Sequence, residues 1–458
     1  MVALSLRLFG AILLEPWHDE YFSIWVVQGS VGQMLDALRQ DAGPPLPYLL
    51  AKLVTLLGAA PLVAIRAVSV LSGTLAAIFL GAAAKAVCSP RAGLWACWLL
   101  AVHPLAVMWG SEGRAYALLN LAVAGSLWAQ GSGGERGKTY FLAGFLTLGL
   151  YTHALGLLWL LAIAGFAFFR RHRSQLLACG IASLLFLPWL PILLQQPREA
   201  VAWMGRFDIE LPSWAHWLGP LRLLPPVASW GYTLEAPLPH VFFQVVAAAA
   251  TLLALVGGWG FWWLFLLPTV FLTAGWALGL PVFFPGRGEA LFLASAVALM
   301  ACGMARWPKV FGAGFLAFSL AGSFAIFHYW KSRPLRPEGQ IAAWLQKRAA
   351  GGILVTTGWW WLGMRYRLSP SWQVVHVPAA ALEHPGWFLP GRERVRGDEL
   401  AKLKALLAKQ VRHGGAAVLL TPGLPETARL RQMLRELGFA PAMGVPSGIL
   451  YVAKVSFD

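Results

Sequence analysis

The 458-residue sequence contains few charged residues: Asp, Glu, Lys and Arg together make up 12% of it, whereas soluble domains carry about 25%. Hydrophobic residues make up 58%, and the mean hydropathy is +0.63. This scarcity of charge excludes a soluble globular enzyme, a disordered chain and a coiled coil. We therefore predict one polytopic membrane domain together with a smaller second domain.

Cysteine and nucleotide-binding motifs are also scarce. The four cysteines, Cys88, Cys97, Cys179 and Cys302, lie in apolar stretches without CxxC spacing. This pattern predicts neither a disulfide framework nor a zinc site, so we expect buried, inert thiols. The sequence has no GxxxxGK[ST] phosphate loop, no GxGxxG, no internal repeat and no typical signal peptide. These absences argue against P-loop and Rossmann nucleotide sites.

Long apolar segments are abundant, and about 20 apolar helical residues cross a bilayer core. We predict eleven spans, of which the first is too short for a full crossing and is either incomplete in this chain or tilted. We expect residues 19–40 and 46–63 to form helices at the outer surface, since the first mixes polar and apolar positions and prolines interrupt the second. The spans are roughly 1–14, 66–86, 93–109, 115–130, 139–151, 155–170, 175–193, 240–257, 260–280, 289–305 and 309–328.

The distribution of basic residues predicts the orientation of these spans. With the N-terminus in the cytoplasm, the inner loops hold nine Lys and Arg against one acid, Glu135, whereas the outer loops up to residue 330 hold eight against eleven acids. Such an excess of basic residues is typical of cytoplasmic loops. Topology therefore accounts for much of the formal charge of +16, and we predict no nucleic-acid partner. The 24 Trp fit interfacial anchoring, although Trp also stacks on sugars.

Residues 331–458 differ in kind, with eighteen Lys and Arg against eight acids. Strand patterns at 352–357, 416–420 and 449–455 alternate with helix patterns at 341–348, 398–411 and 426–437. We predict that this segment is a small α/β domain on the outer side. The membrane domain then spans 1–330, with surface helices at about 15–60. The basic surface could keep this domain soluble, or contact anionic headgroups or an acidic acceptor.

Ionisable residues of the membrane domain cluster in its predicted outer turns. Taken singly, each has a structural explanation: a solvated pair, an internal ion pair, a packed polar group or a headgroup anchor. Their shared placement is informative, because ionisable residues at membrane depth tend to be functional. The residues are Asp19, Glu20, Asp41, Glu112, Arg114, His153, Arg287 and Glu289.

These side chains suit glycosyl transfer from a lipid-phosphate sugar. A carboxylate can act as general base on a hydroxyl, and arginines can bind phosphate oxygens and stabilise a departing phosphate. A carboxylate with an imidazole could hold a divalent metal, for which Asp41 and His153 are the candidates.

The order of several short motifs carries a family resemblance. Leu-Arg-Leu-Phe at 6–9 precedes Trp-His-Asp-Glu at 17–20, followed by Pro-Pro-Leu-Pro-Tyr at 44–48 and Arg-Ala-Val-Ser at 66–69. Ser-Glu-Gly-Arg-Ala-Tyr at 111–116, Tyr-Thr-His at 151–153 and Phe-Pro-Gly-Arg at 284–287 come next. This series resembles the bacterial protein O-mannosyltransferase-like superfamily, which includes lipid A aminoarabinose transferases and shares the GT-C membrane fold. The resemblance covers about residues 1–170 and extends more loosely beyond them.

The resemblance implies roles for individual residues. Asp19 would be the catalytic base and Glu20 its support, whereas Arg114 and Arg287 would bind the lipid phosphate. Glu112, Tyr116, His153 and Asp41 would bind substrate or a metal, or serve a structural role. The family often has His or an acidic-Lys pair before Pro-Pro-Leu, where this chain has Ala42 and Gly43, which weakens the inference of a metal.

Together these features predict an inverting glycosyltransferase of the cytoplasmic membrane, active on its outer face. The expected donor is a polyprenyl-phosphate sugar, and the acceptor is a hydroxyl of a lipid, glycan or protein. The alternative is a transporter or flippase of a lipid-linked or anionic solute, although transporters tend to have repeated halves. A third interpretation is a non-catalytic assembly protein whose outer domain is a docking module.

Overall fold

The computed structural model describes residues 1–131, 134–197, 200, 262–278, 287–306, 309–332, 337–379, 395–411, 416–421, 427–445 and 448–453. By its internal contacts the chain divides into two compact units. The first comprises residues 1–14 and 26–329, and the second comprises residues 15–25 and 330–458.

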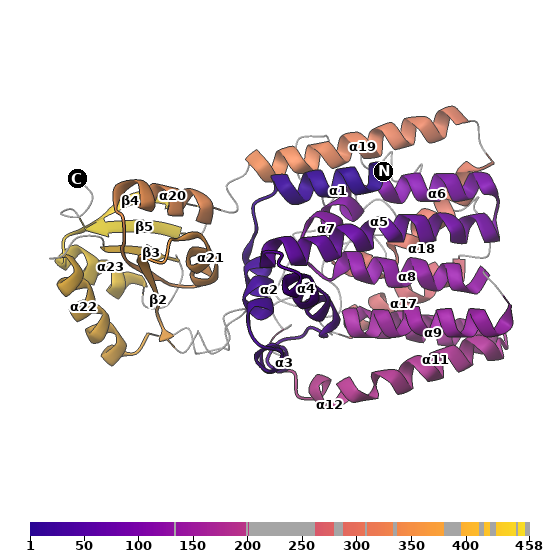
Figure 1. The fold of residues 1–458 in the computed structure, drawn as a ribbon, viewed down its shortest axis with the longest axis horizontal. Coiled ribbons are helices and arrows are strands. Elements are labelled where there is room, and N and C mark those ends of the chain that lie inside the picture. The colour runs from indigo at the N-terminus through magenta and orange to yellow at the C-terminus, as the bar shows by residue number, and fades with distance from the viewer. Residues whose placement is uncertain are drawn as a thin grey trace. The chain divides into compact units, whose positions relative to one another are not determined.

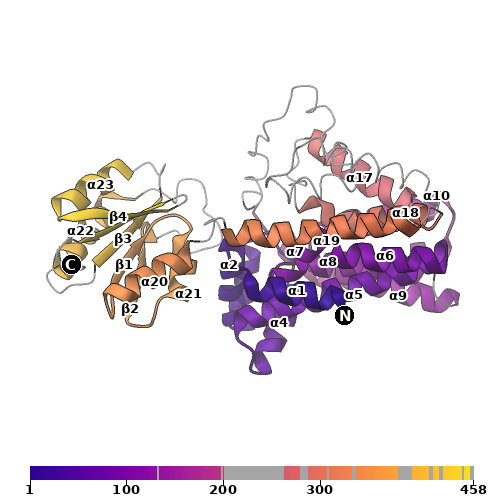
Figure 2. The same ribbon diagram turned by 90° about the horizontal axis from the view of Figure 1, so that it is seen from above.

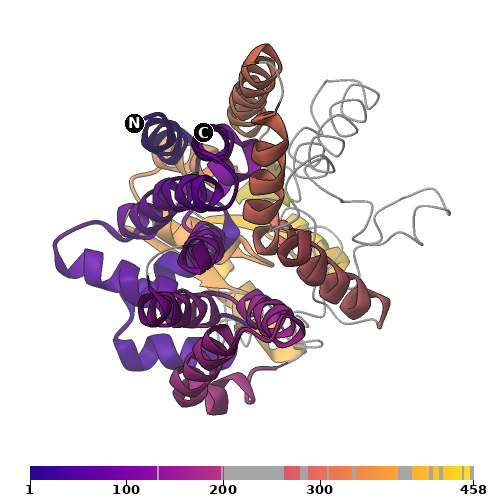
Figure 3. The same cartoon turned by 90° about the vertical axis from the view of Figure 1, so that its right-hand side faces the viewer.

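The first unit is a bundle of apolar helices that run side by side (Figure 1) and are seen end-on in Figure 3. Helices lie at every predicted span within the described residues, and the predicted span 240–257 falls outside them. By length and composition, two of the described helical stretches could cross a membrane, and a bent pair would add a third, so eleven spans stay a prediction. The helices are α1 (Val2–Leu13), α5 (Pro61–Val87), α6 (Pro90–Val102), α7 (Pro104–Ser111), α8 (Tyr116–Gly131), α9 (Glu135–Thr152), α10 (Leu155–Phe169), α11 (Arg173–Phe186), η1 (Leu187–Trp189), α12 (Leu190–Leu193), α17 (Trp262–Ala277), η6 (Gly288–Leu291), α18 (Leu293–Met304) and α19 (Lys309–Ser332).

Packing within this unit brings helices from distant parts of the sequence together. Helix α19 lies beside α1 (Figures 1 and 2), and the ring of Phe9 is 5.5 Å from that of Phe327. Helix α5 contacts both α6 and α8, and small buried residues such as Ala76, Ala77 and Gly81 line it, which lets neighbouring backbones approach closely.

The segment expected as one surface helix over 19–40 forms two helices, α2 (His18–Gln28) and α3 (Val31–Arg39). Ser30 ends the first and caps the second: its hydroxyl accepts the Gln33 N–H at 3.2 Å, and the Gln33 side chain accepts the Ser30 N–H at 2.8 Å. Residues Tyr21, Phe22, Ile24, Val26 and Val27 are buried, so α2 is not exposed along one polar face as expected. The segment 46–63 contains α4 (Leu46–Leu56), followed by the start of α5.

The predicted span at 93–109 is broken where His103 and Pro104 end α6, and α7 continues at an angle of 56°. Proline supplies no N–H, so it leaves carbonyls of the preceding turn without helical partners. The buried guanidinium of Arg7 donates to two of them, Leu100 O at 3.1 Å and Ala101 O at 3.0 Å. Gly73 and Gly110 leave the space that this side chain occupies, because a Cβ at either would lie 2.6 Å from its Nε.

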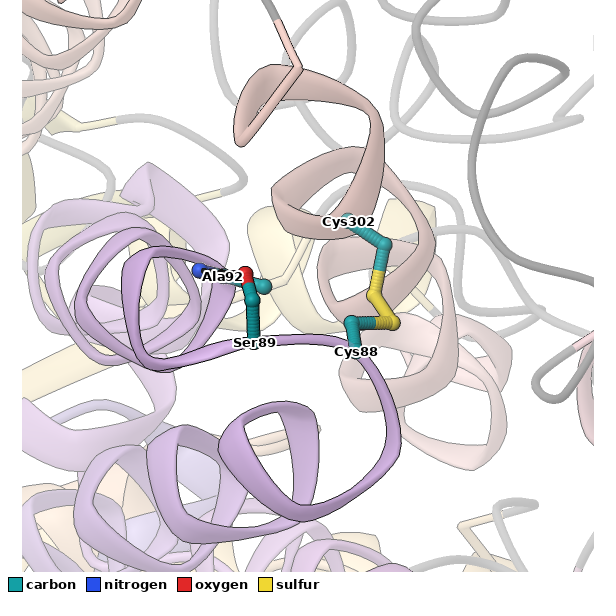
Figure 4. The surroundings of a disulfide bond; sticks show 4 residues. All are labelled: Cys88, Ser89, Ala92 and Cys302. Atoms are coloured by element: carbon teal, nitrogen blue, oxygen red, sulfur yellow. Dashed lines mark hydrogen bonds between the residues drawn. A yellow bond between two sulfur atoms is a disulfide. The ribbon is translucent and has the colours of Figure 1, made fainter.

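A disulfide joins Cys88, just after α5, to Cys302 in α18 (Figure 4). The expectation of four inert thiols is therefore wrong for these two residues, whereas Cys97 is free and half-buried and Cys179 is free and buried. The pairing closes a loop of 214 residues, and no spacing rule of the sequence indicates a partner so far away.

The second unit contains a five-stranded sheet of order β2-β1-β3-β5-β4. Its strands are β1 (Gly352–Thr356), β2 (Trp372–His376), β3 (Ala416–Leu420), β4 (Phe439–Val445) and β5 (Gly448–Ala453). Strand β1 pairs parallel with β2 and β3, and β5 pairs antiparallel with β3 and β4. Strands β1, β3 and β5 lie at the three predicted strands, whereas β2 and β4 were not predicted.

Helices cover both faces of this sheet. Alternate residues of β3 face opposite sides: Val418 packs with Leu407 of α22 (Gly397–Val411) and Leu434 of α23 (Thr427–Glu436). On the other face, Leu419 packs in a cluster with residues of α20 (Glu338–Arg348) and α21 (Trp360–Arg367). Figure 1 shows these layers, and α21 is the one of these helices that the sequence did not predict.

Candidate active site

The turn from Glu112 to Ala115 links α7 to α8 and carries two of the predicted site residues. Glu112 is 5% exposed, and its carbonyl accepts the Arg114 N–H at 2.9 Å. The Ser69 hydroxyl on α5 donates to Arg114 O at 3.1 Å. A Cβ at Gly113 would overlap the side chain of Ile65, so glycine permits this close approach to α5. Helix α5 therefore fixes the position of the turn.

His153 lies in the turn between α9 and α10, outside both helices. Its Nδ1 accepts the Leu155 N–H at 3.1 Å, and its ring is 5.5 Å from that of Tyr116 at the start of α8. Burial, followed by the guanidinium groups of Arg114 and Arg287, lowers the pKa of His153 to about 4. The imidazole is therefore neutral at pH 7, and both arginines act on it electrostatically.

Arg287 and Glu289 lie at η6, which contacts α8, α10 and α18. Glu289 is fully buried and Arg287 is half-buried. The structure thus gathers Arg114, Tyr116, His153 and Arg287 from three separate turns at one end of α8 and α10. Guanidinium groups with nearby neutral donors form a set that suits a phosphate.

Asp41 lies in the loop before α4. A Cβ at Gly43 would be 3.7 Å from Asp41 Oδ2 and 3.8 Å from the Tyr48 hydroxyl, and the Gln196 side chain donates to Gly43 O at 3.3 Å. The described residues contain no group of three or more His, Cys, Asp or Glu that could hold a metal ion.

Asp19 and Glu20 belong to the second unit. They lie in the first turn of α2, where Asp19 is half-buried, its carbonyl accepts the Ser23 hydroxyl at 2.9 Å, and Glu20 is fully buried. Residues next to this turn contact α21 and Trp359, which precedes α21. The Arg367 side chain donates to the Tyr21 hydroxyl at 3.0 Å and pairs with Glu15, and the ring of His18 is 5.8 Å from that of Trp359.

Arg66 is a positioning residue that sequence analysis did not assign. The residue is 5% exposed, and its guanidinium donates to Ala11 O at 2.6 Å and Leu14 O at 2.8 Å, which satisfies carbonyls at the end of α1. One turn later on α5, Ser69 binds Arg114 O. A single stretch of α5 therefore holds both the end of α1, five residues before Asp19, and the Arg114 turn. The sequence could have indicated this role, because Arg66 is an isolated arginine in an apolar helix.

Comparison with known proteins agrees with this architecture. A family model described as dolichyl-phosphate-mannose-protein mannosyltransferase matches residues 42–193. No curated protein matches the sequence. The structure of ArnT from Cupriavidus metallidurans bound to undecaprenyl phosphate is similar, with 15% identity, a TM-score of 0.51, and coverage of 100% of this chain and 98% of ArnT.

The apo structure of the same ArnT gives 14% identity, a TM-score of 0.53 and the same coverage. The predicted resemblance is confirmed. An oligosaccharyltransferase from Archaeoglobus fulgidus is similar at 12% identity and a TM-score of 0.47, covering 94% of this chain and 69% of that one. The family match over residues 42–193 and the ArnT-like fold agree with the membrane architecture described above.

Proposed function

We propose that the protein transfers a sugar from a polyprenyl-phosphate donor to a hydroxyl acceptor with inversion at the anomeric carbon. The observation that carries the proposal is the gathering of Arg114, Arg287 and His153 at one end of the helices, where η6 contacts α8 and α10. The donor's phosphate lies at the headgroup plane while its polyprenyl tail stays in lipid. Undecaprenyl phosphate, the ligand named for the ArnT structure, has this chemistry.

In the proposed mechanism, Asp19 accepts the proton of the acceptor hydroxyl. The oxygen attacks the anomeric carbon, the bond from that carbon to the phosphate oxygen breaks, and polyprenyl phosphate leaves with the electron pair. Because the phosphodiester becomes a monoester, one further negative charge develops on the leaving group. Arg114 and Arg287 stabilise that charge, and one displacement inverts the anomeric centre.

The remaining predicted residues receive supporting roles. Neutral His153, whose Nδ1 is already bonded to the Leu155 N–H, can donate through Nε2 to phosphate or sugar oxygens. The Tyr116 ring packs against it at 5.5 Å. Glu112 and Glu20 are buried and orient their turns, and Asp41 contacts sugar hydroxyls.

A purified protein separates transfer from transport. In detergent micelles there is no second compartment, so a transporter would leave a polyprenyl-phosphate sugar intact. We expect the protein with acceptor-containing membrane extract to release polyprenyl phosphate, and mass spectrometry to detect the sugar on a lipid, glycan or protein. An intact donor, combined with movement of the same donor between the leaflets of a liposome, would replace the transferase with the flippase.

We further propose that the candidate active-site residues face the outer side of the cytoplasmic membrane and that residues 331–458 lie on the same side. The charge distribution supports this orientation but also puts Cys88 and Cys302 at the inner end, and disulfides persist mainly in oxidising compartments. The side therefore needs direct measurement. In a Cys97→Ser, Cys179→Ser background, an impermeant maleimide should label Asp19→Cys and Arg287→Cys in intact cells, and Gly134→Cys only after permeabilisation. The reverse pattern would invert the proposed topology.

The Gly113 turn gives a test of positioning. In Gly113→Ala the new Cβ overlaps Ile65 and displaces the Arg114 turn, so we expect transfer to fall by roughly 10²-fold, as for a 1 Å misplacement. Adding Ile65→Ala should restore most of the activity. Gly144→Ala, where a Cβ meets nothing within 4 Å, serves as the matched control. Normal turnover in Gly113→Ala would show that the turn does not need this approach.

A further inference from the structure

A cavity of about 400 Å³ lies at the opposite end of the helices from His153 and Tyr116. It is lined by the end of α8, the start of α9 and the turn from α10 to α11. Helix α8 has 16 residues, which at 1.5 Å per residue separates its two ends by about 24 Å. The cavity is therefore distinct from the candidate active site.

The lining of this cavity is strongly basic. It includes Lys138, Arg171 and Arg173 together with His172, and no Asp or Glu is among the lining residues. The guanidinium groups of Arg171 and Arg173 at this cavity favour an anionic occupant.

Backbone geometry in the α10–α11 turn favours the same kind of ligand. Arg171 has φ 57°, a left-handed conformation that is uncommon for arginine, and it redirects the chain into α11. His172 precedes α11 without a side-chain cap, and although the Gln175 N–H donates to His172 O at 3.2 Å, the N-terminal end of this 14-residue helix favours an anion.

Gln175 adds a polar side chain to the lining of the cavity. The Gln175 side chain donates weakly to Gln130 Oε1 at 3.5 Å, whereas its own Oε1 is buried and has no hydrogen-bond partner among the described residues. A side-chain amide beside the cations of the cavity can bind a ligand that carries a hydroxyl group next to its phosphate.

The helices that line the cavity carry exposed apolar side chains close in sequence to its lining residues. Tyr140 and Phe141 of α9 are 69% and 52% exposed, Phe168 and Phe169 of α10 are 69% and 77% exposed, and Leu177 of α11 is 60% exposed. Inorganic phosphate would not cover these apolar side chains, whereas the acyl chains of a lipid would. Basic pockets between membrane helices bind anionic headgroups by this combination of charge and apolar surface.

We propose that this cavity binds the phosphate of an anionic phospholipid headgroup, with phosphatidylglycerol as the chemical type. The proposal is independent of the transferase activity. Native mass spectrometry of the full chain in detergent should detect phosphatidylglycerol binding on the order of 10-fold tighter than phosphatidylcholine. The Arg171→Gln, Arg173→Gln variant should lose that preference.

The controls separate a pocket from general surface charge. Arg91→Gln, Arg306→Gln removes two arginines that do not line the cavity and should keep the preference. Arg171→Lys, Arg173→Lys should also keep it, and Lys138→Gln should weaken it even where the double Gln variant folds poorly. Displacement of the lipid by millimolar inorganic phosphate would support recognition of the phosphate group itself. Equal binding of both lipids, or equal losses in the two double Gln variants, would overturn the proposal.

Discussion

Replacing Asp19 by Asn is expected to lower sugar transfer by about 10²- to 10⁴-fold, the usual contribution of a general base. The amide keeps the size and one acceptor oxygen of the side chain but does not accept a proton at neutral pH. Transfer can be measured on membranes of a strain that lacks the protein, because these retain unmodified acceptor. Loss of the sugar's mass increment, with full insertion and expression, would support Asp19 as the base.

Asp19 is a better candidate than its neighbour because of exposure. Glu20 is fully buried, whereas Asp19 is half-buried and can reach a substrate hydroxyl. Glu20→Gln should therefore affect stability and expression more than Asp19→Asn does, because it leaves a buried site with altered hydrogen bonding.

A matched substitution tests whether any charge loss near the N-terminus has this effect. Asp36 lies on α3, is 65% exposed at its side chain and pairs with Arg39 at 2.5 Å. Exposed pairs of this kind contribute about 0–1 kcal/mol to stability, so Asp36→Asn should transfer sugar normally. Wild-type turnover in purified Asp19→Asn would remove the base from the mechanism.

The sequence predicts much of the secondary structure because apolar periodicity sets it. The strand at 416–420 agrees with the structure at both ends, and the helices at 341–348, 398–411 and 426–437 agree within a few residues. Helix α21 was not predicted, because Trp359, Trp360 and Trp361 form an aromatic run without helical periodicity. Its buried Trp360 and Met364 instead pack on the sheet, a tertiary contact that overrides local preference.

Residues of the candidate site could be predicted because charged residues are rare in this chain. Arg114, His153 and Arg287 stand out in an apolar sequence, and the structure brings both arginines within electrostatic range of His153. Long-range pairings leave no such local signal. The disulfide between Cys88 and Cys302 and the Arg66 contacts with the end of α1 depend on helix packing. So do the hydrogen bonds from Arg7 to the carbonyls before the bend at His103.

Arg287→Ala is expected to weaken donor binding by roughly 10- to 150-fold, since hydrogen bonds to charged groups contribute about 1.5–3 kcal/mol. Acceptor binding should change much less, because the guanidinium is proposed to bind the lipid phosphate. Binding of a polyprenyl-phosphate sugar to the purified protein measures the first effect. The acceptor concentration for half-maximal transfer measures the second.

Two further variants test whether donor binding depends on the positive charge of Arg287, on the shape of its guanidinium or on an unaltered fold. Arg287→Lys retains a cation but not the planar fork that binds two phosphate oxygens, so it should recover only part of the donor affinity. Arg306→Ala removes an exposed arginine just beyond the other end of α18 and should bind donor like the wild type. If Arg287→Ala binds the donor with unchanged affinity, Arg287 does not contact the phosphate, and Arg114 with neutral His153 would have to bind it alone.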